Sequence, residues 1–358
     1  MIPYVNFLLQ NKPLKEEILE AVGKIIDKGN FILGDEVQKF EENFAKYCGV
    51  NYAVGVANGT DALILAMKAL GIKRGEKIIT APNSFIATIS SIVMAEAKPV
   101  FCDVKEDLNI DLDKLEKLLN KSNVVIPVHL TGNPVDIEKI KAIKNPPVII
   151  EDAAQAVGTS IHGKKAGTLG DIGCFSLHPL KTLGAFGDGG AIITNEKSIY
   201  ENLKILRNHG LEGRDTCKMP SINSRLDTIQ ATILNIKLNH IDSWIKKRRE
   251  IANIYTKELD GVVQTPIETE GAYSTYHTYI IRSKNRDKLK QFLFDNGVDT
   301  RIHYPIPAHL QPSYEYLGYK KGSLPITEKL SQEILSLPIY PELTEGEISH
   351  IISTIKKF

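Results

Sequence analysis

The feature that most constrains the fold is a regular alternation of short apolar runs and helical segments between residues 52 and 195. Each run is apolar on both faces, which is typical of buried strands in a mostly parallel sheet. Helical patterns at 60–71, 84–96, 112–120 and 135–143 separate most of these runs. The alternation predicts an α/β fold with helices on both faces of a mostly parallel mixed sheet. The candidate strands are Ala53–Val56, Lys77–Thr80, Pro99–Asp103, Val124–Val128, Val148–Asp152, Gly173–Leu177 and Ala191–Thr194.

The pattern changes after about residue 222, where a long helical stretch at 225–258 begins. It is followed by strand-like runs at 276–282 and 300–304 and by helical patterns at 287–296, 326–335 and 344–357. We predict a large domain of residues 1–245 and a smaller α+β domain of residues 246–358. The basic run Lys246–Glu250 in the long helix is predicted to be a solvated helix face rather than a binding patch.

Charge and cysteine content exclude several classes of protein. The 44 Lys and Arg against 43 Asp and Glu give a net charge of +1, so nothing favours a nucleic-acid or membrane partner. The four cysteines show no C-x-x-C pairing, so we expect neither a disulfide framework nor a metal site. We expect no signal peptide, because the first residues lack a basic segment followed by an apolar one. No apolar stretch reaches the about 18 residues that a membrane span needs. We expect a cytoplasmic protein.

The first segment that could form part of a functional site is Asn58–Leu63, where a predicted strand is followed by an apolar helix. Gly59 lets the backbone approach a ligand, and Thr60 is a good N-cap. The free amides and the dipole of such a helix start can bind a phosphate. An ordinary capped helix without a ligand is the alternative.

A second segment is Glu151-Asp152 at the end of a strongly apolar strand. Alternation along the strand sends the two carboxylates to opposite faces. Each must find a partner, because burying an unpaired charge is costly. One could meet a cationic ring nitrogen of a cofactor; a metal ligand or a helix cap are the alternatives.

A third segment, Ser176–Gly190, contains Lys181 in a Gly-rich connection between two apolar runs. A loop lysine is usually just solvated. A lysine among apolar groups can instead lose its proton and attack a carbonyl. A phosphate cradle, a carboxylate for a ring nitrogen and such a lysine are together what pyridoxal 5′-phosphate (PLP) requires.

The sequence resembles the nucleotide-sugar aminotransferases of the DegT/DnrJ/EryC1/StrS family, a branch of the fold-type I PLP enzymes. The resemblance covers nearly the whole chain. The motifs that carry it are Phe31–Gly34, Phe40–Ala45, Asn58–Leu63, Glu151–Gln155, Ser176–Gly190, Asn223–Asp227, His303–Pro307 and Leu335–Pro338.

The resemblance implies a role for each matching residue. Lys181 would bind PLP covalently and carry the transferred proton, and Asp152 would pair with the ring nitrogen. Gln155 would lie near the ring's 3′-oxygen, and Phe85 would stack on the ring. The phosphate would be held by Gly59, Thr60 and Ser176, and by Asn223 of a neighbouring subunit. Arg225, His303 and Tyr304, with His309 close by, would bind the substrate.

The resemblance also implies the reaction. A branch of the family with His in place of the lysine performs dehydration, so Lys181 favours transamination. We expect an amino group to move from an amino acid, L-glutamate by preference, to a keto carbon of a dTDP- or UDP-linked sugar. C3 is favoured over C4 because of the His303-Tyr304-Pro305 stretch with His309 and Gln311 nearby. A homodimer with active sites at its interface would be the active unit.

The alternatives are a C4 sugar aminotransferase, a PLP-binding regulator without turnover, and an α/β protein that binds a nucleotide without PLP. The last is disfavoured because no G-x-G-x-x-G follows the first strand.

Overall fold

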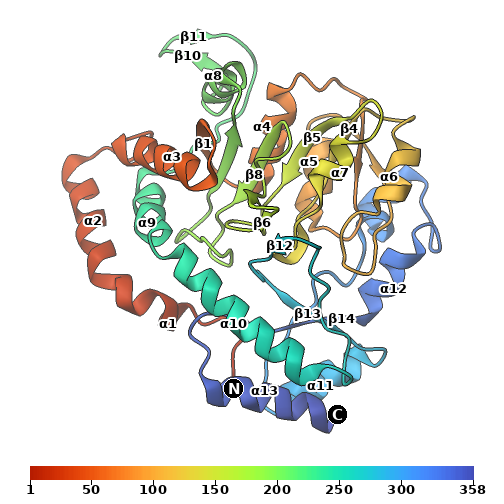
Figure 1. The fold of residues 1–358 in the computed structure, drawn as a ribbon. Coiled ribbons are helices and arrows are strands. Elements are labelled where there is room, and N and C mark those ends of the chain that lie inside the picture. Colours follow the sequence, from red (N-terminus) through yellow and green to blue (C-terminus); the bar gives the residue numbers. More distant parts are fainter.

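Seven strands form the central sheet in a computed structural model that describes residues 1–358 (Figure 1). Their order is β1-β9-β8-β5-β4-β2-β3, and only β9 runs antiparallel to its neighbours. The predicted mostly parallel mixed sheet is therefore confirmed. The strand bounds are β1 Tyr52–Val56, β2 Lys77–Thr80, β3 Lys98–Phe101, β4 Val124–Ile126, β5 Val148–Asp152, β8 Ile172–Ser176 and β9 Gly190–Thr194.

Helices cover both faces of this sheet because alternate strand residues point to opposite sides. Ile78 and Ile150 pack with α4, α5 and α8 on one side. Their chain neighbours Ile79 and Ile149 pack with α6 and α7 on the other, where Phe175 packs with α3 and α9. The helix bounds are α1 Phe7–Asn11, α2 Lys15–Lys28, α3 Asp35–Cys48, α4 Gly59–Ala69, α5 Ile86–Met94, α6 Leu112–Leu118, α7 Ile137–Lys141, α8 Lys197–Leu206 and α9 Thr228–Leu238.

The long helix predicted at 225–258 is in fact two helices, α9 and α10 (Ile241–Leu259). The amides of Asn239 and His240 bond to carbonyls three residues back, and both residue types form helices weakly. The predicted boundary at residue 246 falls inside α10. Ile245 packs in the core of the sheet, whereas Tyr255 packs in a second core.

The second core lies around a two-stranded antiparallel sheet of β13 (Tyr279–Arg282) and β14 (Ile334–Leu337). It includes α11 (Arg286–Asp295), α13 (Glu345–Lys357) and the N-terminal Ile2. Figure 1 accordingly shows both termini beside α13. The strand predicted at 300–304 is reduced to one bridge between Arg301 and Ser336. The predicted helix at 326–335 ends earlier, with α12 at Pro325–Glu333.

Short pairings complete the fold. Two small hairpins, β6 (Ser160–Ile161) with β7 (Lys164–Lys165) and β10 (Leu211–Glu212) with β11 (Thr216–Cys217), extend from the large body. β12 (Ala272–Tyr273) pairs with β6, so this segment of the predicted small domain joins the large one. No helix is both long enough and apolar enough to cross a membrane.

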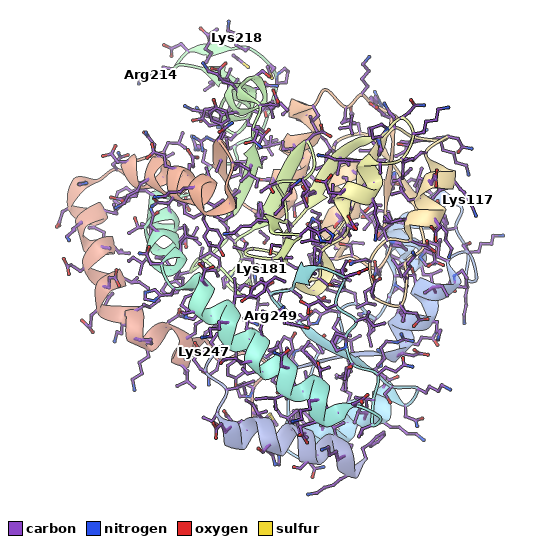
Figure 2. All side chains as sticks on the ribbon, in the orientation of Figure 1. Lys117, Lys181, Arg214, Lys218, Lys247 and Arg249 are labelled. Carbon is purple, nitrogen blue, oxygen red and sulfur yellow. The ribbon has the colours of Figure 1, made fainter.

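The basic run of α10 is only partly a solvated face, which corrects the prediction. Lys246 and Lys247 are exposed, and Figure 2 shows Lys247 on α10. Arg248, however, is only 4% exposed. It lies in the helix stripe formed by Ile241, Ile245, Ala252, Tyr255 and Leu259, which are all buried, so its spacing and not its charge sets its burial.

We predict that Gly173→Ala destabilises the fold. A methyl group on Gly173 in β8 would lie 2.2 Å from the carbonyl oxygen of Gly167. Because backbone must shift to admit it, we expect a loss of about 1–3 kcal/mol in the free energy of unfolding, measured by urea denaturation. Gly23→Ala is the control: no atom lies within 4 Å of its added carbon, and in helix α2 it should gain about 0.5–1 kcal/mol. Equal stability of the two variants would contradict the prediction.

Candidate active site

A pocket of about 420 Å³ lies at the carboxyl ends of the parallel strands. The ends of β5 and β8 supply Asp152 and Ser176, and the loop after β1 leads into Gly59 and Thr60. Ligands of open α/β sheets bind at this edge. Figure 2 shows Lys181 in the middle of the molecule, between the sheet and α10. The second core closes the pocket with residues from distant parts of the chain: Tyr4, Arg248, His277, Thr278, His303, Tyr304 and Ile339.

The start of α4 presents free amides to the pocket. Asn58, not Thr60 as predicted, is the N-cap, because its side-chain oxygen accepts the Asp61 amide at 2.8 Å. The amides of Gly59 and Thr60 donate to no group of the chain. A side chain at Gly59 would put its Cβ 2.8 Å from that of Ser176. The two amides and the Ser176 hydroxyl therefore form an open cradle for an anion.

Asp152 is a buried carboxylate in the same pocket, with only 4% of its surface exposed. The Thr88 hydroxyl donates to it at 2.7 Å and the Ala154 amide at 3.2 Å. Burial raises the pKa of Asp152, while these hydrogen bonds oppose the rise. Asp152 has no cationic partner within ion-pair distance in the chain, so a cation in the pocket would be favoured beside it.

Lys181 provides an amine that donates to no group of the chain. Burial lowers the pKa of Lys181 to about 8, although the Asp152 carboxylate opposes the fall. A larger share of the amine is therefore neutral near physiological pH than for a solvated lysine, and a neutral amine can attack a carbonyl. The shift is consistent with the predicted position of Lys181 between two apolar segments.

An aromatic wall faces the cradle. The Phe85 ring lies 5.3 Å from that of Tyr304, centroid to centroid. The Tyr304 hydroxyl accepts a hydrogen bond from the Gln155 side-chain amide at 3.3 Å. The Gln155 side-chain oxygen in turn accepts the Thr131 amide at 2.8 Å. The structure thus brings all three predicted residues together in one pocket.

His303 also lines the pocket. Its Nδ1 lies 2.8 Å from the Ser336 hydroxyl, and its ring lies 5.6 Å from that of Tyr4. Burial lowers the pKa of His303 to about 4, so the ring is neutral at pH 7. It can bind a polar ligand through hydrogen bonds, but it does not supply a permanent positive charge.

Three predicted residues lie outside the pocket of their own chain. Asn223 is exposed, and the Arg225 guanidinium donates to the Asn208 side chain at 3.0 Å. His309 is 1% exposed and its Nε2 lies 3.1 Å from the Glu328 carboxylate. The contact with Glu328 links the segment of His309 to helix α12. Because the His309 ring is enclosed, it does not reach a substrate in this pocket.

Sequence reasoning missed several pocket residues. Tyr4, Thr88 and His277 carry no local motif, and they meet the site only through the fold. His178, which had no assigned role, also lies at the pocket. For Arg248 a signal existed, since a charged residue at an apolar position of a helix stripe is expected to be buried.

The comparison with protein families agrees with this geometry. The sequence profile described as the DegT/DnrJ/EryC1/StrS aminotransferase family matches residues 12–356. The chain therefore belongs to this aminotransferase family, as its motifs predicted.

Two curated relatives match along the full chain. A protein of Geobacillus stearothermophilus named "Pleiotropic regulatory protein" is 41% identical, over 100% of this chain and 98% of its own length. The dTDP-3-amino-3,6-dideoxy-alpha-D-galactopyranose transaminase of Aneurinibacillus thermoaerophilus is 38% identical, over 100% and 99%.

Solved structures share the fold. DesV of S. venezuelae, in complex with a ketimine intermediate, has a TM-score of 0.97 at 35% identity, covering 99% of this chain and 98% of its own. The ntda protein of Bacillus subtilis, with bound cofactor PMP, has a TM-score of 0.90 at 28% identity, covering 100% and 85%. The fold is thus that of PLP aminotransferases.

We predict that Lys181 becomes reactive at a lower pH than surface lysines. Trace labelling with acetic anhydride, after hydroxylamine treatment to free the amine, should show Lys181 labelling that rises with pH through about 8. Solvated lysines should rise only near a pKa of about 10.4. Peptide mass spectrometry measures both in one sample. A midpoint for Lys181 equal to that of the exposed lysines would contradict the effect of burial.

Proposed function

We propose that this protein is a PLP-dependent aminotransferase of nucleotide-linked keto-sugars. The observation that carries the proposal is the convergence of an unbonded lysine amine, a buried carboxylate and a free helix N-terminus in one pocket. The names of relatives support it, since the Aneurinibacillus relative is named a transaminase of a dTDP-linked amino sugar.

The residues present fit PLP. The phosphate would occupy the cradle of Gly59, Thr60 and Ser176, where a Cβ on residue 59 would not fit. The ring nitrogen would pair with Asp152, and its positive charge would compensate the buried carboxylate. Phe85 would cover the ring, and Gln155 would lie near the 3′-oxygen. Lys181 would bond to the aldehyde carbon.

The chain's own groups would carry the proton transfers. When bound, PLP supplies an electron sink that stabilises negative charge on the carbon next to the transferred nitrogen. Lys181 Nζ, freed when the donor's amine takes its place, would take the proton from the α-carbon of the amino-acid donor. Water would release the donor as a 2-oxo acid, and its nitrogen would stay in the pocket with the cofactor. Asp152 would keep a proton on the ring nitrogen. In the second half-reaction Lys181 Nζ would give a proton to the former keto carbon of the sugar, whose oxygen leaves as water, and the sugar would leave as an amino sugar.

The substrate we propose is a dTDP- or UDP-linked 3-keto sugar, with L-glutamate as amino donor. Support for C3 comes from the relative named a 3-amino sugar transaminase. His303 and Tyr304 line the pocket, and we propose that they hydrogen-bond the sugar. His309, which contributed to the sequence argument for C3, is enclosed elsewhere and gives no support.

We further propose that two copies form the active unit. Phe31 and Ile32 are each 45% exposed and are followed by Leu33 at 37%, so the turn presents a contiguous apolar patch of the kind that marks interaction sites. Phe31 and Ile32 lie against Asp227 and Thr228, next to the segment that carries Asn223 and Arg225. A partner covering this apolar turn would also receive Asn223 and Arg225 near its own cradle.

The Geobacillus relative is named a regulatory protein, so a regulator without turnover is the second candidate. The unbonded amine and the buried carboxylate would serve PLP binding in either case. Catalysis is favoured because other relatives of similar identity are named transaminases.

We predict a visible absorbance band in the purified protein that bleaches on addition of L-glutamate. Incubation with glutamate and a panel of dTDP- and UDP-linked keto-sugars should give an amino sugar, whose new amine NMR can place at C3 or C4. Lys181→Ala should abolish turnover while the melting temperature stays near that of the wild type. A band that glutamate and other amino donors leave unchanged would favour the regulator, and no band even with added PLP would refute the proposal.

We predict complementation between inactive variants. Lys181→Ala and the double variant Asn223→Ala/Arg225→Ala should each be inactive. After subunit exchange in mild urea, a mixture should recover about a quarter of wild-type activity, because each hybrid dimer contains one intact site. Wild type mixed with Lys181→Ala is the dilution control. No recovery, with hybrids verified by mass, would contradict sites shared between subunits.

A further inference from the structure

A buried arginine with no carboxylate within ion-pair distance lines the pocket. Arg248 of α10 is 4% exposed, and no carboxylate lies within ion-pair distance of it, whereas its neighbour Arg249 pairs with Glu268. Only one end of its guanidinium is used. Nη1 donates to the carbonyl oxygens of Ile339 at 2.7 Å, Tyr276 at 3.3 Å and His277 at 3.5 Å.

The positive charge of Arg248 remains in this environment. Burial lowers the pKa of Arg248 to about 10, which leaves it protonated at pH 7. A buried cation is costly unless an anion pairs with it. The three carbonyl dipoles and the Glu342 carboxylate, which lies beyond ion-pair distance, compensate only in part. Nε and Nη2 donate to no group of the chain.

The other cationic candidates in the pocket are accounted for. Among the residues that line it, only Arg248 and Lys181 are Arg or Lys. His277 and His303 are neutral, because burial lowers the pKa of both. The third pocket histidine, His178, lies in the loop of Lys181, where its Nδ1 accepts the Leu180 amide at 3.2 Å. The carbonyl of Ile339 and the 276–277 turn fix the guanidinium from the side of the second core, across the pocket from the α4 cradle.

We propose that Arg248 binds the α-carboxylate of the amino-acid donor. This inference rests on the aminotransferase activity proposed above. Two adjacent N–H groups of a planar guanidinium match the two oxygens of a carboxylate. The α-carboxylate is attached to the carbon whose proton Lys181 removes, so its binding site must share the pocket with Lys181. A nucleotide diphosphate is separated from the reacting carbon of the sugar by the sugar ring and fits this position less well.

The test separates the two half-reactions. In Arg248→Lys, which keeps a charge and a donor for the Ile339 carbonyl, kcat/KM for bleaching of the absorbance band by L-glutamate should fall about 100-fold or more. The rate at which the nucleotide amino sugar bleaches the same band, by the reverse of the second half-reaction, should stay within about threefold, because this substrate has no α-carboxylate. The rate with 4-aminobutyrate, which is glutamate without its α-carboxylate, should also be unchanged. Arg249→Lys, outside the pocket, should leave all three rates unchanged.

A second readout does not need turnover. Binding of α-methylglutamate, which has no α-proton to lose, should weaken by a similar factor in Arg248→Lys, measured by spectral titration. Unchanged glutamate kinetics and binding would overturn the proposal. An equal loss in both half-reactions would also overturn it and would assign Arg248 to the fold or to the diphosphate. A wild-type protein that responds to neither substrate would instead refute the aminotransferase activity itself.

Discussion

The site depends on one buried carboxylate that takes no part in it. Glu151 is fully buried, where an isolated charge would be prohibitively costly. It accepts the amides of Gly167 and Leu169 at 2.8 and 2.7 Å and the Nε2 of His129 at 2.8 Å. These hydrogen bonds to Glu151 fix the loop before β8 and the loop after β4 against β5. Because neighbouring strand residues point to opposite faces, fixing Glu151 inward on one side also fixes Asp152 in the pocket on the other.

The same network extends to the aromatic wall. With Nε2 donating to Glu151, His129 accepts the Val135 amide through Nδ1 at 3.0 Å, and so shapes the loop that contains Thr131. The Thr131 amide orients Gln155, and Gln155 orients Tyr304. Rigid positioning of this kind is what allows a pocket to hold a planar ligand at one distance from a lysine. The hydrogen bonds that fold the loops also set the geometry of the site.

The parts of the fold and site that the sequence predicts are those encoded locally. Buried parallel strands have a continuous apolar pattern. Asp152 ends such a strand, and Lys181 and Gly59 each follow one. Residues that reach the pocket from elsewhere, such as Tyr4 and His277, leave no local trace, because only the packing of the second core brings them there. Where two local signals compete, as at Asn58 and Thr60, helix geometry decides, and Asn58 takes the cap. The α9–α10 break is of the same kind, since a two-residue interruption barely disturbs the helical period.

Charge at the site differs in kind from charge on the rest of the molecule. The chain as a whole is nearly balanced, and buried charges elsewhere, such as Arg207 with Glu41, are paired. In the pocket, Asp152 and Arg248 are each buried with no oppositely charged group of the chain within ion-pair distance. Each lowers the stability of the ligand-free fold, and each is compensated if a ligand of opposite charge binds. Asp152 favours a cationic group on one wall of the pocket, and Arg248 favours an anionic group on another. Together they would orient the bound ligands as well as bind them. The same unpaired charges that lower the stability of the ligand-free fold therefore provide the selectivity for ligands.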